Sequence, residues 1–195
     1  MIYKKGEKVL LPQDLHIHTI FSERDDSVAP QQTIELIDQF RYAEKMGISD
    51  HFEHLSDPDK YIKSVKSLRF YAGTEVSEST GFNDAATVDF DYYLCHCRDK
   101  AVDYKGVETL LATGKPVIVA HPMALGADPA KLPTDAYLEI NNRYIWRNDW
   151  RNFFTPLLPH YKFVIGSDAH QPHWLNQNIA RQVVRELGIV ETILF

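Results

Sequence analysis

The sequence predicts an α/β fold built on a parallel β-sheet, and two observations support this prediction. Seven short runs rich in β-branched and aromatic residues are spread along the 195-residue chain. Stretches with helical spacing lie between most of them. No glycine-rich phosphate loop follows the first run, which disfavours the nucleotide-binding form of an open sheet. Because strand–helix alternation produces parallel strands covered by helices, an open doubly wound sheet and a closed or partly closed barrel remain as architectures.

Each of the seven runs is short enough for a buried strand and is bounded by turn-forming or polar residues. The expected strands cover residues 15–18, 47–50, 69–75, 90–96, 117–120, 137–140 and 163–166. Since helical stretches separate most of these strands, their carboxyl ends are expected to lie on a common face.

Helices are expected over residues 30–45, 57–67, 103–113, 147–160 and 175–187. The first has Pro30 in its opening turn and Gly47 as a stop signal. Gly114 and Gly188 are stop signals for the third and the last, and Pro156 can kink or break the fourth. Residues 122–134 contain three prolines and a glycine, so a loop or a short helix is expected there.

The composition is that of one ordinary globular domain over residues 1–195, with 21 basic and 27 acidic side chains and a formal net charge of −6. This acidic balance disfavours a dedicated nucleic-acid-binding protein. No apolar run approaches the roughly 20 residues of a membrane helix, and the N-terminal segment lacks the apolar stretch of a signal peptide. With two cysteines, Cys95 and Cys97, too few for a disulfide framework, a cytoplasmic location is expected.

Six of the nine histidines lie at or just after the end of an expected strand, together with two acids. In a parallel barrel these ends meet on the face where active sites are built. Taken singly, each residue is explained as well by a structural hydrogen bond or a cap, but their shared placement favours one site. The residues are His16, His18, His51, Glu75, His96, His121, Asp168 and His170.

The first strand carries an H-x-H pair, His16 and His18. Because side chains alternate along a strand, the two imidazoles point the same way and can serve one metal centre. Six imidazoles with several carboxylates and no cysteine suit zinc, manganese or iron. Eight or nine ligands exceed the needs of one ion, so two or three divalent ions are expected, with Glu75 as a natural bridge.

The charge of such a centre favours an anionic substrate. Three divalent ions outweigh the three carboxylates Asp25, Glu75 and Asp168. A metal-bound hydroxide, together with a multi-metal clamp on the attacking and leaving oxygens, suits hydrolysis of a phosphoester.

The order of these motifs resembles that of the polymerase and histidinol phosphatase (PHP) superfamily. The matching segments are DLHIHT at 14–19, SDH at 49–51, GTEV at 73–76, the strand of His96, AHP at 120–122 and GSDAH at 166–170. The resemblance runs from residue 14 to at least residue 170. It implies a distorted TIM-like (β/α)7 barrel of PHP type, a trinuclear metal site and hydrolytic phosphoester chemistry.

The resemblance also implies the ligand set. Carried over residue by residue, the ligands are His16, His18, His51, Glu75, His96, His121, Asp168 and His170, and the expected catalytic residues among them are His16, His18, Glu75, Asp168 and His170. A ninth ligand is expected shortly after the H-x-H pair, where this chain reads FSERDDS. Glu23, Asp25 and Asp26 compete for that position, and the spacing favours Asp25.

Three further residues are candidates for binding substrate. Arg143 and Arg147 follow the sixth strand, and either could hold a phosphate bidentately, although a solvated or acid-paired arginine is the commoner reason for such a residue. His54, one helical turn after His51, could contact substrate or donate a proton, with surface exposure as the simpler alternative.

Four polar residues could support the ligands. Glu139 and Asn141 share strand parity, so both could face the site, and a structural hydrogen bond explains them equally well. Asp14 and Asp50 each lie near an expected ligand and could orient it, as metal-bound imidazoles require, or could act as a cap or a solvated acid.

These observations predict a metal-dependent phosphoesterase, a phosphoric monoester hydrolase acting on a small phosphorylated substrate with two or three divalent transition-metal ions. The alternatives are a histidinol-phosphate or phosphotyrosine phosphatase, then a nuclease, and then a non-catalytic, metal-binding regulatory domain. Neither nucleic acid nor a membrane is expected as a partner, and the oligomeric state stays open.

Overall fold

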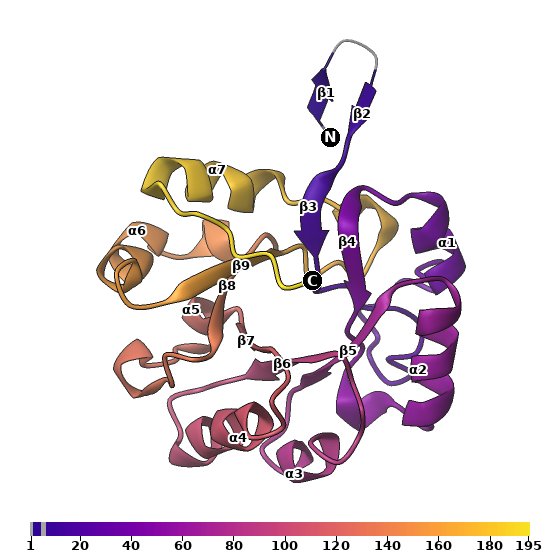
Figure 1. The fold of residues 1–195 in the computed structure, drawn as a ribbon, viewed down its shortest axis with the longest axis horizontal. Helices are drawn as coiled ribbons and strands as arrows, with labels where there is room; N and C mark the ends of the chain where they lie inside the picture. The colour runs from indigo at the N-terminus through magenta and orange to yellow at the C-terminus, as the bar shows by residue number, and fades with distance from the viewer. Residues whose placement is uncertain (1, 5–6) are drawn as a thin grey trace.

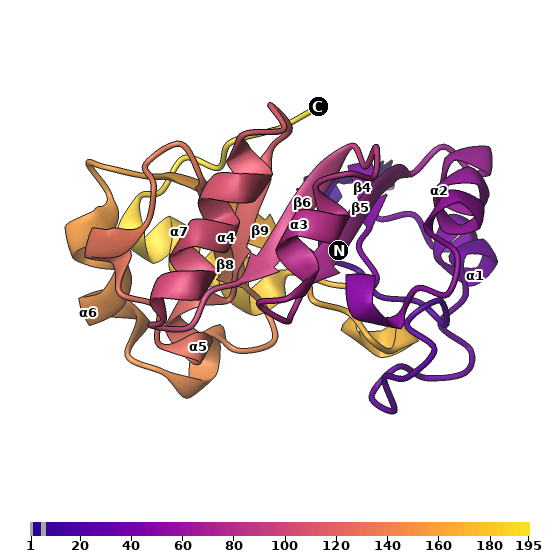
Figure 2. The ribbon, with the colours of Figure 1, turned by 90° about the horizontal axis from the view of Figure 1, so that it is seen from below.

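A computed structural model of the protein describes residues 2–4 and 7–195. Seven parallel strands form one sheet in which neighbours in space are also neighbours in the chain. The strands are β3 (Leu11–Asp14), β4 (Ala43–Ile48), β5 (Tyr71–Val76), β6 (Tyr92–His96), β7 (Val117–Ala120), β8 (Tyr137–Asn141) and β9 (Lys162–Gly166). The sheet curls into a nearly closed barrel with the helices outside it (Figures 1 and 2), so the expected α/β barrel is confirmed.

The barrel closes at a seam between β3 and β9, which are not joined by a regular ladder in the described residues. The side chain of Gln177 fills the gap and donates hydrogen bonds to the carbonyl oxygens of Gln13 (2.9 Å) and Ile165 (3.0 Å). Beyond the end of β3, the backbone N–H of Asp168 donates to the carbonyl oxygen of His16 at 2.8 Å. The seam therefore depends on a few specific hydrogen bonds.

The helices of the outer layer are short. They are α1 (Ile34–Gln39), α2 (Pro58–Ser67), α3 (Gly81–Ala85), α4 (Ala101–Leu111), α5 (Pro122–Leu125), α6 (Trp150–Phe154) and α7 (Asn178–Leu187). The Asp57 side chain caps α2 by accepting from the backbone N–H of Lys60 at 2.9 Å, and α7 ends at Gly188 in the left-handed conformation.

The helix predicted over residues 30–45 was wrong for most of its length. Only α1 forms, and the chain then enters β4, so Met46 reaches the core from a strand. Gly47 lies inside β4 and not at the end of a helix. Glycine is needed at this position because a Cβ there would lie 2.3 Å from the Tyr92 hydroxyl. The apolar spacing of this segment fits a helix and a strand alike, and pairing with β3 and β5 decides between them.

Other boundaries also differ from the sequence prediction, and two elements were missed. The first strand occupies Leu11–Asp14 instead of 15–18, which leaves His16 and His18 just past its end. The helix expected over 147–160 is divided into α6 and 3-10 turns on either side, with Pro156 in the second turn. Helix α3 was missed, as was an antiparallel hairpin of β1 (Ile2–Lys4) and β2 (Glu7–Val9), which projects from the barrel (Figure 1).

The amino-terminal half of the barrel interior is filled with apolar side chains. The ring of Tyr92 lies against the backbone of Gly73, where a Cβ would be 2.2 Å from it, and its hydroxyl donates to the carbonyl oxygen of Leu15 at 2.7 Å. Phe195 stacks on Tyr71 with 4.0 Å between ring centroids. The buried members of this interior cluster are Leu15, Tyr92, Leu94, Ile118, Ala120 and Val164.

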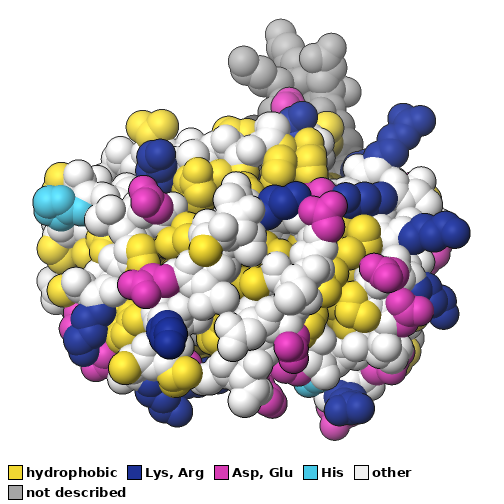
Figure 3. Space-filling view, turned by 60° about the horizontal axis from the view of Figure 1, so that its bottom comes forward, with side chains coloured by type: hydrophobic (Ala, Val, Ile, Leu, Met, Phe, Trp, Pro, Cys, Tyr) yellow, Lys and Arg dark blue, Asp and Glu magenta, His cyan; other side chains and the backbone are white. Residues whose placement is uncertain are grey.

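A larger apolar core lies between the strands and the surrounding helices and includes Ile48, Tyr61 and Phe90. On the face shown in Figure 3, basic and acidic side chains are interspersed. Among the described residues, no helix has both the length and the apolar character needed to span a bilayer.

Candidate metal centre

The carboxyl ends of the strands bring the predicted metal ligands together. Ligand atoms within 4.8 Å of one another form four overlapping groups, His18–His51–His170, His16–His18–Glu75, His16–His121–Asp168 and Glu75–His96–His121. These residues follow or end β3, β4, β5, β6, β7 and β9. The barrel topology therefore assembles one cluster from residues that are far apart in the sequence, and we call it the ligand cluster.

Glu75 lies at the centre of the ligand cluster and is 1% exposed. Its Oε1 atom lies 3.1 Å from Nε2 of His96 and 3.3 Å from Nε2 of His121. Its Oε2 atom lies 3.3 Å from Nε2 of His18 and 3.3 Å from Nδ1 of His51. Among the described residues, no aligned hydrogen bond uses Oε1. A carboxylate whose two oxygens face different imidazoles is suited to bridge two ions.

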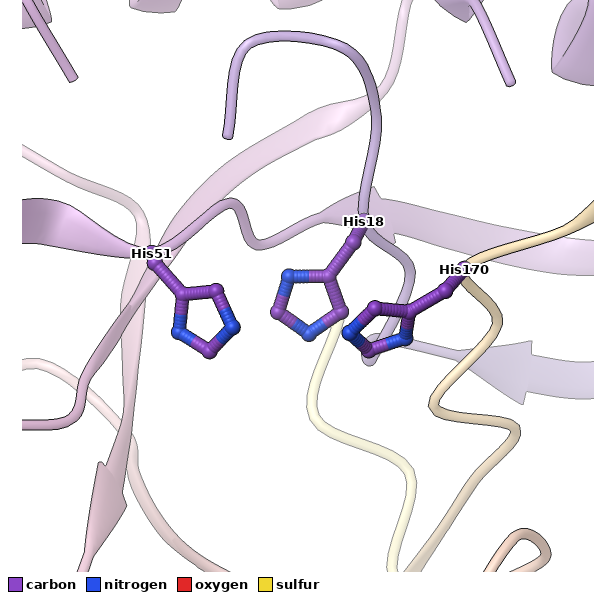
Figure 4. A group of neighbouring side chains, drawn as sticks. All are labelled: His18, His51 and His170. Carbon is purple, nitrogen blue, oxygen red and sulfur yellow. The ribbon is translucent and has the colours of Figure 1, made fainter. Parts of the chain in front are cut away.

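Three imidazoles form one side of the ligand cluster. Figure 4 shows the ring of His18 between those of His51 and His170, with centroid distances of 4.5 and 4.1 Å. Burial and the neighbouring His170 and His51 hold the pKa of His18 well below its ordinary value. The ring is therefore neutral, which is the form that coordinates metal.

The acids of the ligand cluster are ionised although they are buried. Burial opposes the charge on Asp168, but His16 and His170 outweigh it and lower the pKa of this carboxyl below its ordinary value. Burial also opposes the charge on Glu75, whose pKa is lowered well below its ordinary value by His96 and His16. The ionised carboxylates and the neutral His18 are therefore in the form that coordinates divalent transition metals, whereas His16, His51 and His170, whose pKa values the neighbouring acids raise, would release a proton on binding a metal.

Of the three candidates for the ninth ligand, the structure brings Asp25 to the ligand cluster. Its Oδ2 atom lies 3.1 Å from Nε2 of His170 and 3.4 Å from Nε2 of His51. Glu23 is exposed and accepts a hydrogen bond from Ser56, and Asp26 is also exposed. The loop after β3 therefore selects the residue that the spacing favoured.

A second layer of hydrogen bonds orients the ligands. Glu139, 1% exposed, lies 2.7 Å from Nδ1 of His16 and accepts from the backbone N–H of His121 (2.8 Å) and from Nδ2 of Asn141 (2.9 Å). The close approach needs Gly166, because a Cβ there would lie 1.9 Å from Oε1 of Glu139. A carboxylate on the far nitrogen of a ligand histidine fixes the ring and raises its basicity.

Asp14 and Asp50 support the loops and not the imidazole rings. Asp14 accepts from the backbone N–H groups of His16 (3.2 Å) and Ser167 (3.1 Å). Asp50 accepts from the backbone N–H and the hydroxyl of Thr19 at 2.7 and 2.6 Å. Burial raises the pKa of Asp50 to about 6.

Two residues of the ligand cluster have left-handed backbones, His121 with φ 31° and Asp168 with φ 54°. For residues other than glycine this conformation costs on the order of 1–3 kcal/mol each and persists where the surrounding structure enforces it. His121 comes directly after β7 and Asp168 shortly after β9, and in both residues the left-handed backbone accompanies the turn of the side chain toward the cluster.

A cavity of about 290 Å³ opens onto the ligand cluster. Arg143 lines it and places Nη1 3.4 Å from Oδ1 of Asp168 and 3.2 Å from Nδ1 of His170. Arg147 does not line the cavity; it is exposed and its guanidinium lies over the ring of Trp146. His54 also lies outside the cavity lining, with its ring centroid 5.2 Å from that of His51.

Sequence reasoning missed three residues near the ligand cluster. Ser77 Oγ lies 2.7 Å from Nδ1 of His51, and Arg98 Nη2 lies 3.4 Å from Nδ1 of His96. Tyr144 lines the cavity beside Arg143. A signal existed for two of them, because Ser77 and Arg98 lie just past β5 and β6 and each follows a ligand by two residues, the spacing that puts side chains on one side of an extended chain.

No protein-family model and no curated protein matches this chain.

Proposed function

We propose that the protein is a metal-dependent phosphoesterase of the PHP superfamily, with a PHP-type barrel, that hydrolyses a small phosphomonoester. The observation that carries the proposal is the convergence of six imidazoles and the carboxylates of Asp25, Glu75 and Asp168 in one cluster, of which the three carboxylates and four of the imidazoles line one cavity. The order of the sequence motifs supports the same assignment.

Two or three divalent transition ions (zinc, manganese or iron) fit the residues present. The ions would be held in three regions of the cluster, with Glu75 between them. The first region consists of His16, His18 and Asp168, the second of His96 and His121, and the third of His51, His170 and Asp25. When bound, such ions lower the pKa of water and neutralise phosphoryl oxygens. The buried and unprotonated His18 and the unbonded Oε1 of Glu75 are the features that this assignment explains.

The chain's own residues position the substrate. Arg143 presents its guanidinium at the edge of the ligand cluster, where it can donate two hydrogen bonds to a phosphoryl group. Glu139 keeps the ring of His16 in one orientation. In the reaction, the oxygen of water adds to phosphorus, the bond from phosphorus to the leaving oxygen breaks, and that oxygen takes a proton from solvent in the open cavity.

The two cysteines fit a reducing compartment, and we include a cytoplasmic location in the proposal. Cys95 and Cys97 are both free and buried. Burial raises the pKa of Cys97 to about 12, so its thiol is protonated and inert at neutral pH.

The test is metal analysis of the purified protein combined with hydrolysis of 4-nitrophenyl phosphate. We expect bound transition ions, activity lost on chelation, and a loss of at least about 100-fold in His18→Ala. His160→Ala, an exposed histidine outside the cluster, is the matched control. Full activity in His18→Ala contradicts the proposal. Metal binding without hydrolysis of a broad phosphate panel favours the regulatory alternative.

A further inference from the structure

A second hollow of about 300 Å³ lies beside the metal cavity. We call it the tryptophan groove. Arg143 lines both hollows, so its side chain stands between them. The residues of the groove used below are Asn142, Arg143, Trp146, Arg147, Trp174 and Ile179.

The groove combines exposed apolar surface with positive charge. Trp146 is 59% exposed and Ile179 is 42% exposed. The guanidinium of Arg143 lies 4.9 Å from the ring of Trp174, and that of Arg147 lies 5.0 Å from the ring of Trp146. Such surfaces suit a flat aromatic group, which can stack on indole and guanidinium planes.

Arg147 is not neutralised by an acid. Within the part of the chain that the structure describes, no carboxylate lines the groove and no ion pair involves Arg147. By contrast, the neighbouring Arg151 pairs with Glu186. The groove therefore offers a cation to an anionic ligand in addition to its aromatic surface.

The floor of the groove is held in place by Asn142, which is 9% exposed. Its Oδ1 atom accepts from the backbone N–H groups of Ile179 (3.0 Å) and Ala180 (3.1 Å) in the first turn of α7. This contact ties the end of β8 to α7, so the two walls of the groove keep a fixed spacing.

We propose that the tryptophan groove receives the leaving group of the substrate, and that this group is aromatic and carries a second negative charge. The inference rests on the proposed function, because the phosphoryl group must occupy the metal cavity. Arg143 contacts Asp168 and His170 on one side and Trp174 on the other, so it joins the two hollows. Since a cavity of about 150 Å³ holds benzene, a groove of about 300 Å³ has room for a substituted ring.

The test compares phenyl phosphate, 4-carboxyphenyl phosphate and glycerol phosphate as substrates of the metal-loaded protein. In each case the bond from phosphorus to the leaving oxygen breaks, and that oxygen takes a proton from solvent. We expect kcat/KM for the carboxylated substrate to exceed that for phenyl phosphate by about tenfold, and Arg147→Ala to remove this preference without changing the metal content.

Two further variants sharpen the result. Trp146→Ala is expected to lower kcat/KM for both aryl substrates about tenfold relative to glycerol phosphate. Arg151→Ala is the matched control, because this arginine also lies over a tryptophan ring, that of Trp150, but outside the groove. It is expected to match the wild type with all three substrates.

Two outcomes separate this inference from the proposed function. Hydrolysis of all three substrates with the same selectivity in the wild type and in Arg147→Ala overturns the groove assignment and leaves the phosphoesterase assignment standing. If the metal-loaded wild type hydrolyses none of the three, the phosphoesterase assignment fails and the groove assignment fails with it.

Discussion

The two halves of the barrel interior are equally buried and chemically opposite. In the amino-terminal half, Leu94 and Val164 are 0% and 3% exposed; in the carboxyl-terminal half, His18, Glu75 and Asp168 are 0%, 1% and 2% exposed. Apolar groups gain free energy from burial itself, whereas buried charges need partners to offset the loss of water. The apolar half therefore stabilises the barrel by packing, whereas the buried charges of the polar half need partners to be stable.

The same strands build both halves. Leu94 and His96 are two residues apart on β6 and therefore lie on the same side of the strand. Strand β6 thus places an apolar residue in the interior before it delivers a polar one at its end. A change in the apolar half is expected to affect stability through packing, and a change in the polar half to affect ligand binding and the pH dependence of stability.

The largest effect is expected in the apolar half. Tyr92→Ala should lower the free energy of unfolding by about 4 kcal/mol, because it empties a fully buried site against Gly47 and Gly73. Urea denaturation measures the loss. As a control, Tyr92→Phe keeps the ring and removes the hydrogen bonds of its hydroxyl to the carbonyl oxygens of Leu15 and Ile48, which costs about 1 kcal/mol. Equal losses in the two variants contradict the packing role of the ring.

The next effect concerns pH and belongs to the polar half. Burial lowers the pKa of His170, but Asp168 and Asp25 outweigh burial and raise it to about 9. The folded state then holds this proton more tightly than the unfolded state, whose histidine titrates near 6.5. In the metal-free protein, the stabilisation is complete below about pH 6.5 and is lost as the pH rises to about 9, with a size of up to about 3 kcal/mol.

Chelator-treated protein tests this pH dependence by urea denaturation at pH 6 and pH 9. His170→Gln should lose stability relative to the wild type at pH 6 and match it more closely at pH 9. A constant difference between the two proteins over this range contradicts the assignment of the proton to His170.

A smaller effect is expected from the second layer of the ligand cluster. Glu139→Gln removes the charge beside Nδ1 of His16 and should weaken metal binding 10- to 100-fold, which corresponds to about 1–3 kcal/mol. Competition with a chromophoric chelator measures the affinity. Glu186→Gln, which removes an exposed acid paired with Arg151, should leave it unchanged. Unaltered affinity in Glu139→Gln means that the carboxylate does not tune the site.

The smallest effect lies outside both halves. Asp57→Ala removes the N-cap of α2 and should cost about 1 kcal/mol in the free energy of unfolding. Metal affinity and pH dependence should stay as in the wild type. If either changes, the outer layer and the ligand cluster are coupled, and the separation between stability and binding does not hold.

The ligand cluster was predictable because its members lie within a few residues of strand ends, so errors of a few residues in the strand boundaries did not remove them from the common face. Glu75 and His121 lie where the alternation of strands and helices puts them. The supporting contacts were harder to predict, because they join distant segments. Nothing local indicates that Gln177 reaches the carbonyl of Gln13 or that Gly166 makes room for Glu139.

The two arginines after β8 also show that local sequence does not predict which distant residue a side chain contacts. Arg143 and Arg147 looked equivalent in the sequence, yet one reaches Asp168 and the other lies over Trp146. The turn that follows β8 determines this difference, and short-range spacing does not encode it. The prediction for residues 40–48 failed for a related reason. The apolar spacing of this segment fits both a helix and a strand, and only pairing with the neighbouring strands selects the strand.

The seam has a consequence for the kinetics of barrel opening. His16 and His18 lie on one side of it, and Asp168 and His170 on the other, with the N–H of Asp168 bonded to the carbonyl of His16. An ion bound between these residues would link the two sides of the least regular junction of the sheet. Amide hydrogen exchange at Asp168 should therefore slow on metal loading far more than exchange in the ladder of β5 and β6, where a continuous set of hydrogen bonds already protects the backbone.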